Sequence, residues 1–123
     1  MMALSGKLLI NLLAAFMLTA FATVTVAQDN DAEIEYLLTS VGSSNCVFIR
    51  NGTQHPAANA ESHLRMKYEK THRFIDNADE FIDKLASKSS WTGKPYALAC
   101  TGAEVQTTKS WLLERLAEYR TAN

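Results

Sequence analysis

Two cysteines constrain what this chain can fold into more than any other residues in it. The 123-residue sequence contains Cys46, Cys100 and no further cysteine. They lack the CxxC spacing of a redox or zinc site. An even number of cysteines favours a disulfide in an exported protein, and the N-terminal segment described below leads us to expect that this chain is exported. A bond between residues 54 positions apart would stabilise the fold by about 4 kcal/mol, because it lowers the conformational entropy of the unfolded chain. A nucleophilic cysteine is the alternative, but a free reactive thiol would be oxidised after export, so we predict a structural Cys46–Cys100 disulfide.

Residues 1–27 have the three parts of a secretory signal peptide. Lys7 provides the positive charge, residues 8–21 form an apolar run, and the small residue Ala27 precedes the expected cleavage point. A membrane anchor is the alternative, but a span needs about 20 strongly apolar residues, and this run weakens earlier. We therefore expect cleavage after Ala27, export, and no membrane span in what remains.

Residues 28–123 are predicted to form a single small globular domain, because domains usually have about 50 to 250 residues. A hydrophobic content of 47% with 20% charged residues excludes a disordered chain. Twelve basic residues against 13 acidic ones also argue against a nucleic-acid partner, since such binders usually have a basic domain with clustered Lys and Arg.

The spacing of hydrophobic residues predicts about four helices and two short strands. The helices are expected near 29–41, 56–74, 78–86 and 108–120, and the strands at 46–50 and 96–100. One cysteine opens the first strand and the other closes the second, which suits an antiparallel pair bridged at one end. The expected fold class is therefore α+β, mostly helical with a short two-stranded antiparallel ribbon and one disulfide.

Signals for catalysis, metals or cofactors are weak in this sequence. The histidines His55, His63 and His72 lack the i, i+4 spacing that places two ligands on one helix face. Gly93-Lys94 does not belong to a phosphate-binding loop of the form GxxxxGK[ST]. Lys88 occupies the position of the first glycine, and Pro95 occupies the position of the Ser or Thr. No GxSxG elbow occurs, and the carboxylates fall on the predicted outer faces and N-termini of helices. We expect no catalytic residue, no metal and no cofactor.

Polar residues that the predicted core does not use concentrate in two segments, 50–55 and 87–96. Each segment adjoins a strand that carries a cysteine, so a disulfide would bring the two together. Arginine and lysine there would offer charge-assisted hydrogen bonds to an anionic ligand, a saccharide or an acidic envelope protein, and Trp91 and Tyr96 would serve as apolar anchors. The alternative is that 87–94 only connects two elements. The candidate binding residues are Arg50, Asn51, His63, Arg65, Ser89, Ser90, Trp91, Lys94 and Tyr96.

Five ordered motifs resemble the YfeK-like family of small exported bacterial proteins of unknown function. They are FIRNG at 48–52, HLRxK at 63–67, FIDxAxxFID at 74–83, ASxSS at 86–90 and TGKPY at 92–96. The resemblance covers about residues 33–120 and implies a location in the bacterial envelope, periplasmic or secreted. It implies no mechanism.

The function expected from these residues is a non-catalytic binding or protein-interaction module. A second hypothesis is an inhibitor or immunity-type protein that acts on an envelope hydrolase, because TGKPY resembles an SGxxY loop found in several periplasmic lysozyme inhibitors. A third is a small hydrolase, for which His63 and Glu61 would be the residues to test.

Overall fold

The computed structural model describes residues 17–22 and 29–123. Most of the predicted signal peptide, including its cleavage point, lies outside these residues and stays a prediction. No helix within the described ranges is long and apolar enough to cross a membrane.

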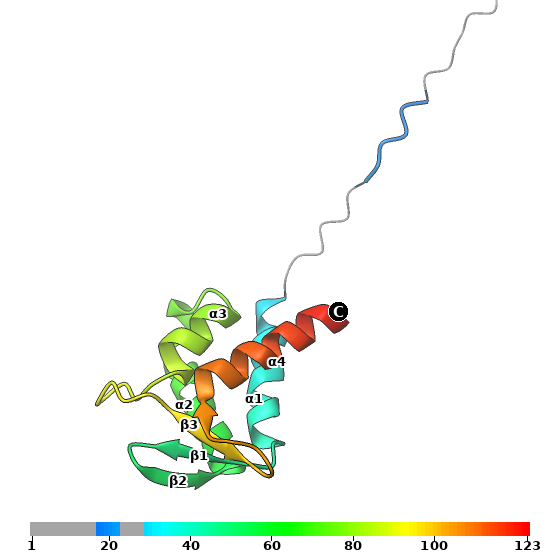
Figure 1. Cartoon of the computed structure of the whole chain (residues 1–123). Helices are drawn as coiled ribbons and strands as arrows, with labels where there is room; N and C mark the ends of the chain where they lie inside the picture. Colours follow the sequence, from blue (N-terminus) through cyan, green and yellow to red (C-terminus); the bar gives the residue numbers. More distant parts are fainter. Residues whose placement is uncertain (1–16, 23–28) are drawn as a thin grey trace, which may run out of the picture.

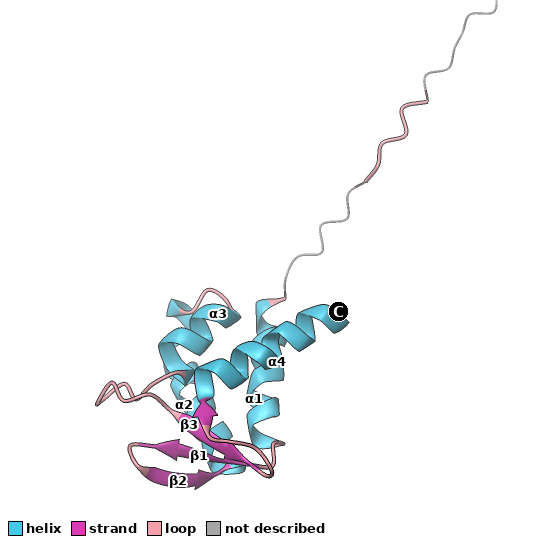
Figure 2. Cartoon of the chain, viewed as in Figure 1, coloured by secondary structure: helices cyan, strands magenta, loops and turns pink. Residues whose placement is uncertain are grey.

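The described chain folds as an α+β domain that is mostly helical, as predicted, with one disulfide (Figure 2). Helix α1 begins after Asp29, whose carboxylate accepts a hydrogen bond from the Ala32 amide, and α4 is capped in the same way by Thr107. In chain order the elements are α1 (Asn30–Gly42), β1 (Cys46–Arg50), β2 (Thr53–Pro56), α2 (Ala57–Thr71), the 3-10 turn η2 (His72–Phe74), α3 (Ala78–Glu80), the π-helical η3 (Phe81–Ala86), β3 (Ala97–Cys100), β4 (Gln106–Thr107) and α4 (Thr108–Ala122).

The sheet has four antiparallel strands in the order β2-β1-β3-β4, so the prediction of only two strands was wrong. The predicted pair, β1 and β3, is the centre of the sheet. Strand β2 has no apolar alternation, with three exposed residues and the half-buried His55, and β4 has two residues, so neither shows a hydrophobic pattern. The Asn51-Gly52 turn after β1 is nevertheless a strong hairpin signal and could have revealed β2.

The disulfide joins Cys46 to Cys100, which confirms the predicted bridge. These residues lie directly opposite each other in the β1–β3 pair, with a Cα–Cα distance of 3.9 Å. The same register places Ile49 opposite Ala97 at the other end of the pair. The covalent bond therefore fixes which residues of the two strands face each other.

The helices gather on one side of the sheet, above it in Figure 1. Helix α1 buries the stripe that its sequence predicts: Ile34, Leu37, Leu38 and Val41. Phe48 of β1 meets Trp111 of α4 edge to face, with ring centroids 6.2 Å apart. One hydrophobic core thus contains residues of the first helix α1, the last helix α4 and the central strand β1.

An ion pair with a buried carboxylate crosses from α1 to α4. Glu33 is only 3% exposed, and Arg120 donates to its two carboxylate oxygens at 2.6 and 3.0 Å. Arg120 also donates to Asp79 at 2.9 Å. Glu33 lies in the first turn of α1, as predicted for the carboxylates near helix N-termini, but it is buried and paired with Arg120 instead of being solvated.

Reduction of the disulfide should lower the free energy of unfolding by up to about 4 kcal/mol, because the unfolded chain regains the entropy of the open loop. Urea unfolding with and without a phosphine reductant measures the difference. The double variant Cys46→Ala/Cys100→Ala is the control, since it should show the lower stability and no response to reductant. Equal stability of oxidised and reduced protein would contradict the prediction.

Candidate functional site

A cleft of about 480 Å³ opens where the end of β1, helix α2 and the loop 87–96 come together. Seven of the predicted binding residues line it: Arg50, Asn51, His63, Ser89, Ser90, Trp91 and Tyr96. The two polar segments that the sequence singled out therefore form one site with a face of α2.

Side chains of the turn after β1 hold the loop 87–96 in place. Asn51 Nδ2 donates to Ser89 Oγ at 3.3 Å, and Thr92 Oγ1 donates to Asn51 Oδ1 at 2.6 Å. The disulfide lies at the opposite end of the β1–β3 pair, so it fixes the strand register but does not touch the cleft. Asn51 makes the direct connection that we had attributed to the disulfide.

The backbone of both segments explains why they take these shapes. Asn51 and Gly52 both have positive φ, 50° and 79°, as the tightest hairpin turn requires. In the loop, the buried Ser89 hydroxyl accepts hydrogen bonds from the amides of Trp91 and Thr92, and Gly93 turns the chain back with φ 73°. This arrangement leaves Trp91 97% exposed on a loop that projects at the left of Figure 1.

Helix α2 contributes residues to the cleft that our sequence analysis did not select. His63 is followed at helical spacing by Met66, Lys67, Lys70 and Thr71, which form one stripe at i, i+3, i+4, i+7 and i+8. This stripe lies beside the apolar one that faces the core. A polar stripe adjoining a core stripe was the signal that could have identified these residues.

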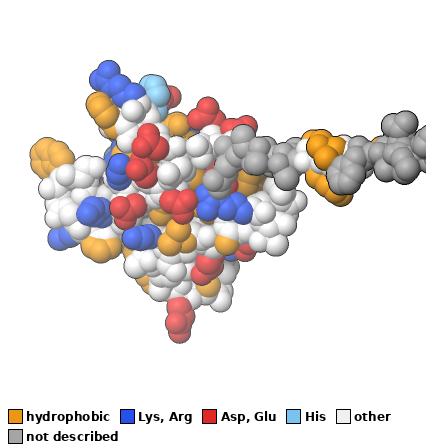
Figure 3. Space-filling view, turned by 90° about the horizontal axis from the view of Figure 1, so that it is seen from above, with side chains coloured by type: hydrophobic (Ala, Val, Ile, Leu, Met, Phe, Trp, Pro, Cys, Tyr) orange, Lys and Arg blue, Asp and Glu red, His pale blue; other side chains and the backbone are white. Residues whose placement is uncertain are grey.

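The cleft is lined by cations and has no acidic residue in its wall. Arg50, Lys67 and Lys70 line it together with His63, while no Asp or Glu does. Within the described residues, no carboxylate lies at ion-pair distance from any of these three cations. Elsewhere the charges are mixed: on the face seen from above in Figure 3, acidic and basic side chains are interspersed.

Lys67 and Tyr96 form the polar floor of the cleft. Lys67 Nζ donates to the carbonyl of Leu85 at 2.7 Å and to the hydroxyl of Tyr96 at 3.3 Å, and it lies 5.2 Å from the centre of the Tyr96 ring. Burial, followed by the charge of Arg50, lowers the pKa of Lys67. Burial raises the pKa of Tyr96, so its hydroxyl stays protonated.

His63 lies half-buried on α2 among these positive groups. Burial is the main cause that lowers its pKa below the ordinary 6.5, and the charges of Arg50, Lys67 and His55 lower it further. At neutral pH the imidazole is therefore uncharged, and acidification adds a positive charge to the cleft.

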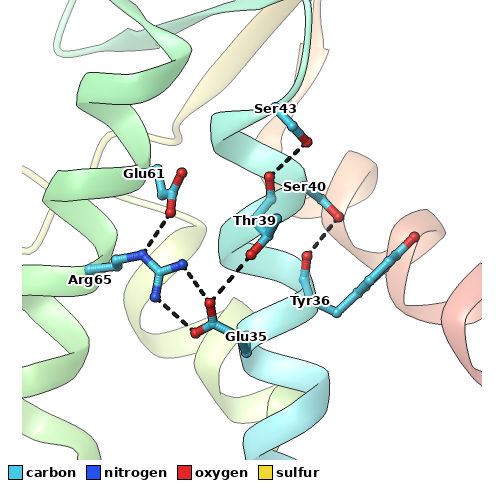
Figure 4. A network of polar contacts seen from close by, with 7 residues as sticks. All are labelled: Glu35, Tyr36, Thr39, Ser40, Ser43, Glu61 and Arg65. Carbon is cyan, nitrogen blue, oxygen red and sulfur yellow. Dashed lines mark hydrogen bonds and ion pairs between the residues drawn. The ribbon is translucent and has the colours of Figure 1, made fainter.

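Two predicted binding residues lie outside the cleft. Arg65 bridges α1 and α2 (Figure 4): its Nε donates to Glu61 at 2.7 Å, and its terminal nitrogens donate to Glu35 at 2.7 and 2.8 Å. These bonds raise the pKa of Arg65 above its ordinary value and lower that of Glu35. Lys94 is exposed in the loop but is absent from the cleft wall.

A second hollow, the disulfide hollow, has about 490 Å³ and lies at the other end of the β1–β3 pair, beside the disulfide, Trp111 and Arg115. Its arginine is already paired, because Arg115 donates to Glu118 at 2.7 Å. No group of three or more His, Cys, Asp or Glu in residues 17–22 and 29–123 is arranged to hold a metal ion. The cationic cleft is therefore the stronger candidate site.

The protein is therefore a small disulfide-bonded α+β domain with a cleft whose cations have no carboxylate partner among the described residues. The chain belongs to a family of unknown function, DUF5329, whose model matches residues 28–120. It is 41% identical over 91 residues to the uncharacterized protein YfeK of Salmonella typhimurium, an alignment that covers 73% of this chain and 76% of the relative. These matches confirm the family that the five motifs indicated. No solved structure matches the chain.

Asn51→Gly should loosen the loop 87–96 without disturbing the hairpin turn. Glycine keeps the positive φ at no steric cost but removes the hydrogen bonds to Ser89 and Thr92. We expect the amides of Trp91 and Thr92 to exchange hydrogen faster, by roughly tenfold if a net hydrogen bond of about 1.4 kcal/mol is lost. Amide exchange followed by NMR measures this, and unchanged rates would show that Asn51 does not hold the loop.

Proposed function

We propose that this domain is an exported, non-catalytic binding module that takes an anionic ligand in the cleft between β1, α2 and the loop 87–96. The observation that carries the proposal is the set of three cations, Arg50, Lys67 and Lys70, that line one cleft with no carboxylate in its wall. Cations held together without counter-charges repel one another and attract anions.

The chemistry around these cations suits an anion carried on a polar body. Arg50 offers a planar fork of donors, which matches a carboxylate or phosphate group, and exposed Ser90 adds a hydroxyl at the rim. Trp91 and Met66 provide exposed apolar surface at the same rim. An aromatic face beside hydroxyls and cations accommodates a sugar ring or another compact polar ligand.

The residues of the cleft support binding rather than catalysis. No carboxylate or thiol lines it, and among the described residues no hydrogen bond joins His63 to the serine hydroxyls of its wall, as activation of a serine nucleophile would require. The pair that a hydrolase would use is separated, because His63 lines the cleft whereas Glu61 is bonded to Arg65. The disulfide supports export, since such bonds persist in oxidising compartments, and the predicted signal peptide agrees with it.

The projecting loop supports a second candidate, an inhibitor or immunity-type protein for an envelope hydrolase. The almost fully exposed Trp91 could enter a partner's cleft, although Tyr96 of the TGKPY motif is 7% exposed and lies at the base of the loop. Micromolar purified protein would then inhibit a muramidase in proportion to dose. Trp91→Ala would abolish that inhibition, and no inhibition of any lysozyme class would eliminate this candidate.

Arg50→Gln should weaken binding of glucose 6-phosphate, used as an anionic probe, by about tenfold or more, because a charge-assisted hydrogen bond is lost. Calorimetric titration at constant ionic strength measures the affinity. Arg73→Gln is the matched control, since it removes the same charge from an exposed position outside the cleft. The proposal is wrong if the wild type binds no anion, or if both variants lose affinity equally.

Anion affinity should rise as the pH falls from about 7.5 to about 5, because His63 becomes protonated below its lowered pKa and adds a cation to the cleft. Inorganic sulfate is the suitable probe, since its charge does not change in this range. His63→Gln should reduce the pH-dependent gain, while the exposed His72→Gln should leave it intact. An affinity that stays flat or falls on acidification of the wild type would contradict this.

A further inference from the structure

A small chamber adjoins the cleft and shares three of its lining residues: Arg50, His63 and Tyr96. Its other walls are mainly apolar, from Phe48 and Ile49 of β1 and from Ala60 and Leu64 of α2. The chamber has a volume of about 30 Å³. One water-sized group needs about 10–15 Å³ of such space, so the chamber has room for two of them.

One polar group in the chamber wall lacks a partner. Thr108 begins α4, lines the chamber and is 1% exposed. Its amide donates to the carbonyl of Tyr96 at 2.9 Å, but its hydroxyl makes no hydrogen bond among the described residues. A buried hydroxyl without a partner costs about 1–3 kcal/mol, so a bound group that accepts its hydrogen bond is favoured there.

We propose that this chamber is an acyl subsite, which receives the acetyl group of an N-acetylated anionic ligand whose charged group lies in the cleft. The proposal rests on the anion-binding function proposed above. The methyl group and the carbonyl oxygen of an acetyl group, joined by the carbonyl carbon, are each about the size of a water molecule and match the two spaces. Its methyl group suits the apolar walls, and its carbonyl accepts a hydrogen bond from Thr108.

The test compares ligands that differ only in the acetamido group. N-acetylglucosamine 6-phosphate is paired with glucose 6-phosphate, and N-acetylaspartate with succinate, so that the pairs distinguish a sugar from an amino-acid carrier. We expect the acetylated member of at least one pair to bind wild-type protein about tenfold more tightly. N-acetylglucosamine without phosphate should bind weakly, because it lacks the anion.

Three variants locate the preference. Thr108→Val keeps the side-chain shape but removes the hydroxyl, and should reduce the preference by about fivefold or more. Ala60→Met fills the chamber and should abolish the preference while glucose 6-phosphate still binds. Thr121→Val makes the same chemical change at an exposed position of α4 outside both the chamber and the cleft, and should leave the preference intact.

Equal affinities within both pairs, with glucose 6-phosphate still bound, would mean that the chamber holds only water and would overturn the subsite while the anion site stands. A preference that survives both Thr108→Val and Ala60→Met would overturn it too. Absence of all anion binding by the wild type would overturn the proposed function and the subsite with it.

Discussion

The pairing of β1 with β3 is the constraint on which the rest of this structure depends. Side chains of a strand alternate between two faces, so a slip of one residue would move every side chain to the other face. In the observed register Phe48 lies opposite Leu98, and both are buried. Arg50 follows two residues after Phe48, on the same face but at the end where the core opens into the cleft. The disulfide at the other end holds this register covalently.

Among the described residues, two ion-pair networks neutralise their arginines with carboxylates, in contrast to the cations of the cleft. Glu33 is neutralised by Arg120 between α1 and α4, and Arg65 is shared by two carboxylates between α1 and α2. In the cleft, by contrast, Arg50 and Lys67 lie close enough that the charge of the first lowers the pKa of the second. A fold selected for stability alone would place a carboxylate there, and local departures of this kind are expected at functional sites.

Much of the fold could be predicted because its signals are local. Apolar residues of α1 recur at helical spacing, and β1 is a short β-branched and aromatic run that ends at Asn51-Gly52. The edge strands β2 and β4 escaped prediction because Thr53–Pro56 and Gln106–Thr107 pair through backbone groups and carry almost no hydrophobic pattern. The burial of Glu33 could not be predicted because its partner, Arg120, lies at the far end of the chain.

The candidate site could be predicted in part for the same reason. The polar segments 50–55 and 87–96 identified six of the residues in the cleft, and His63 was selected separately on α2. The lysines of α2 were not selected, because a lysine on a helix usually indicates only a solvated face. Arg65 differs from Lys67 by two positions, which on a helix turns it to another side of α2. Only the packed fold distinguishes the arginine that pairs with carboxylates from the lysine that faces the cleft.

The most direct test of the anion site is a map of where an anion binds. Isotope-labelled protein titrated with glucose 6-phosphate should show concentration-dependent NMR shifts at Arg50, Lys70, Ser90 and the Trp91 indole. The signals of Trp111 and Arg115, in the disulfide hollow, should stay unchanged. Shifts that are largest in the disulfide hollow, or that are spread evenly over the surface lysines and arginines, would contradict a single cationic site.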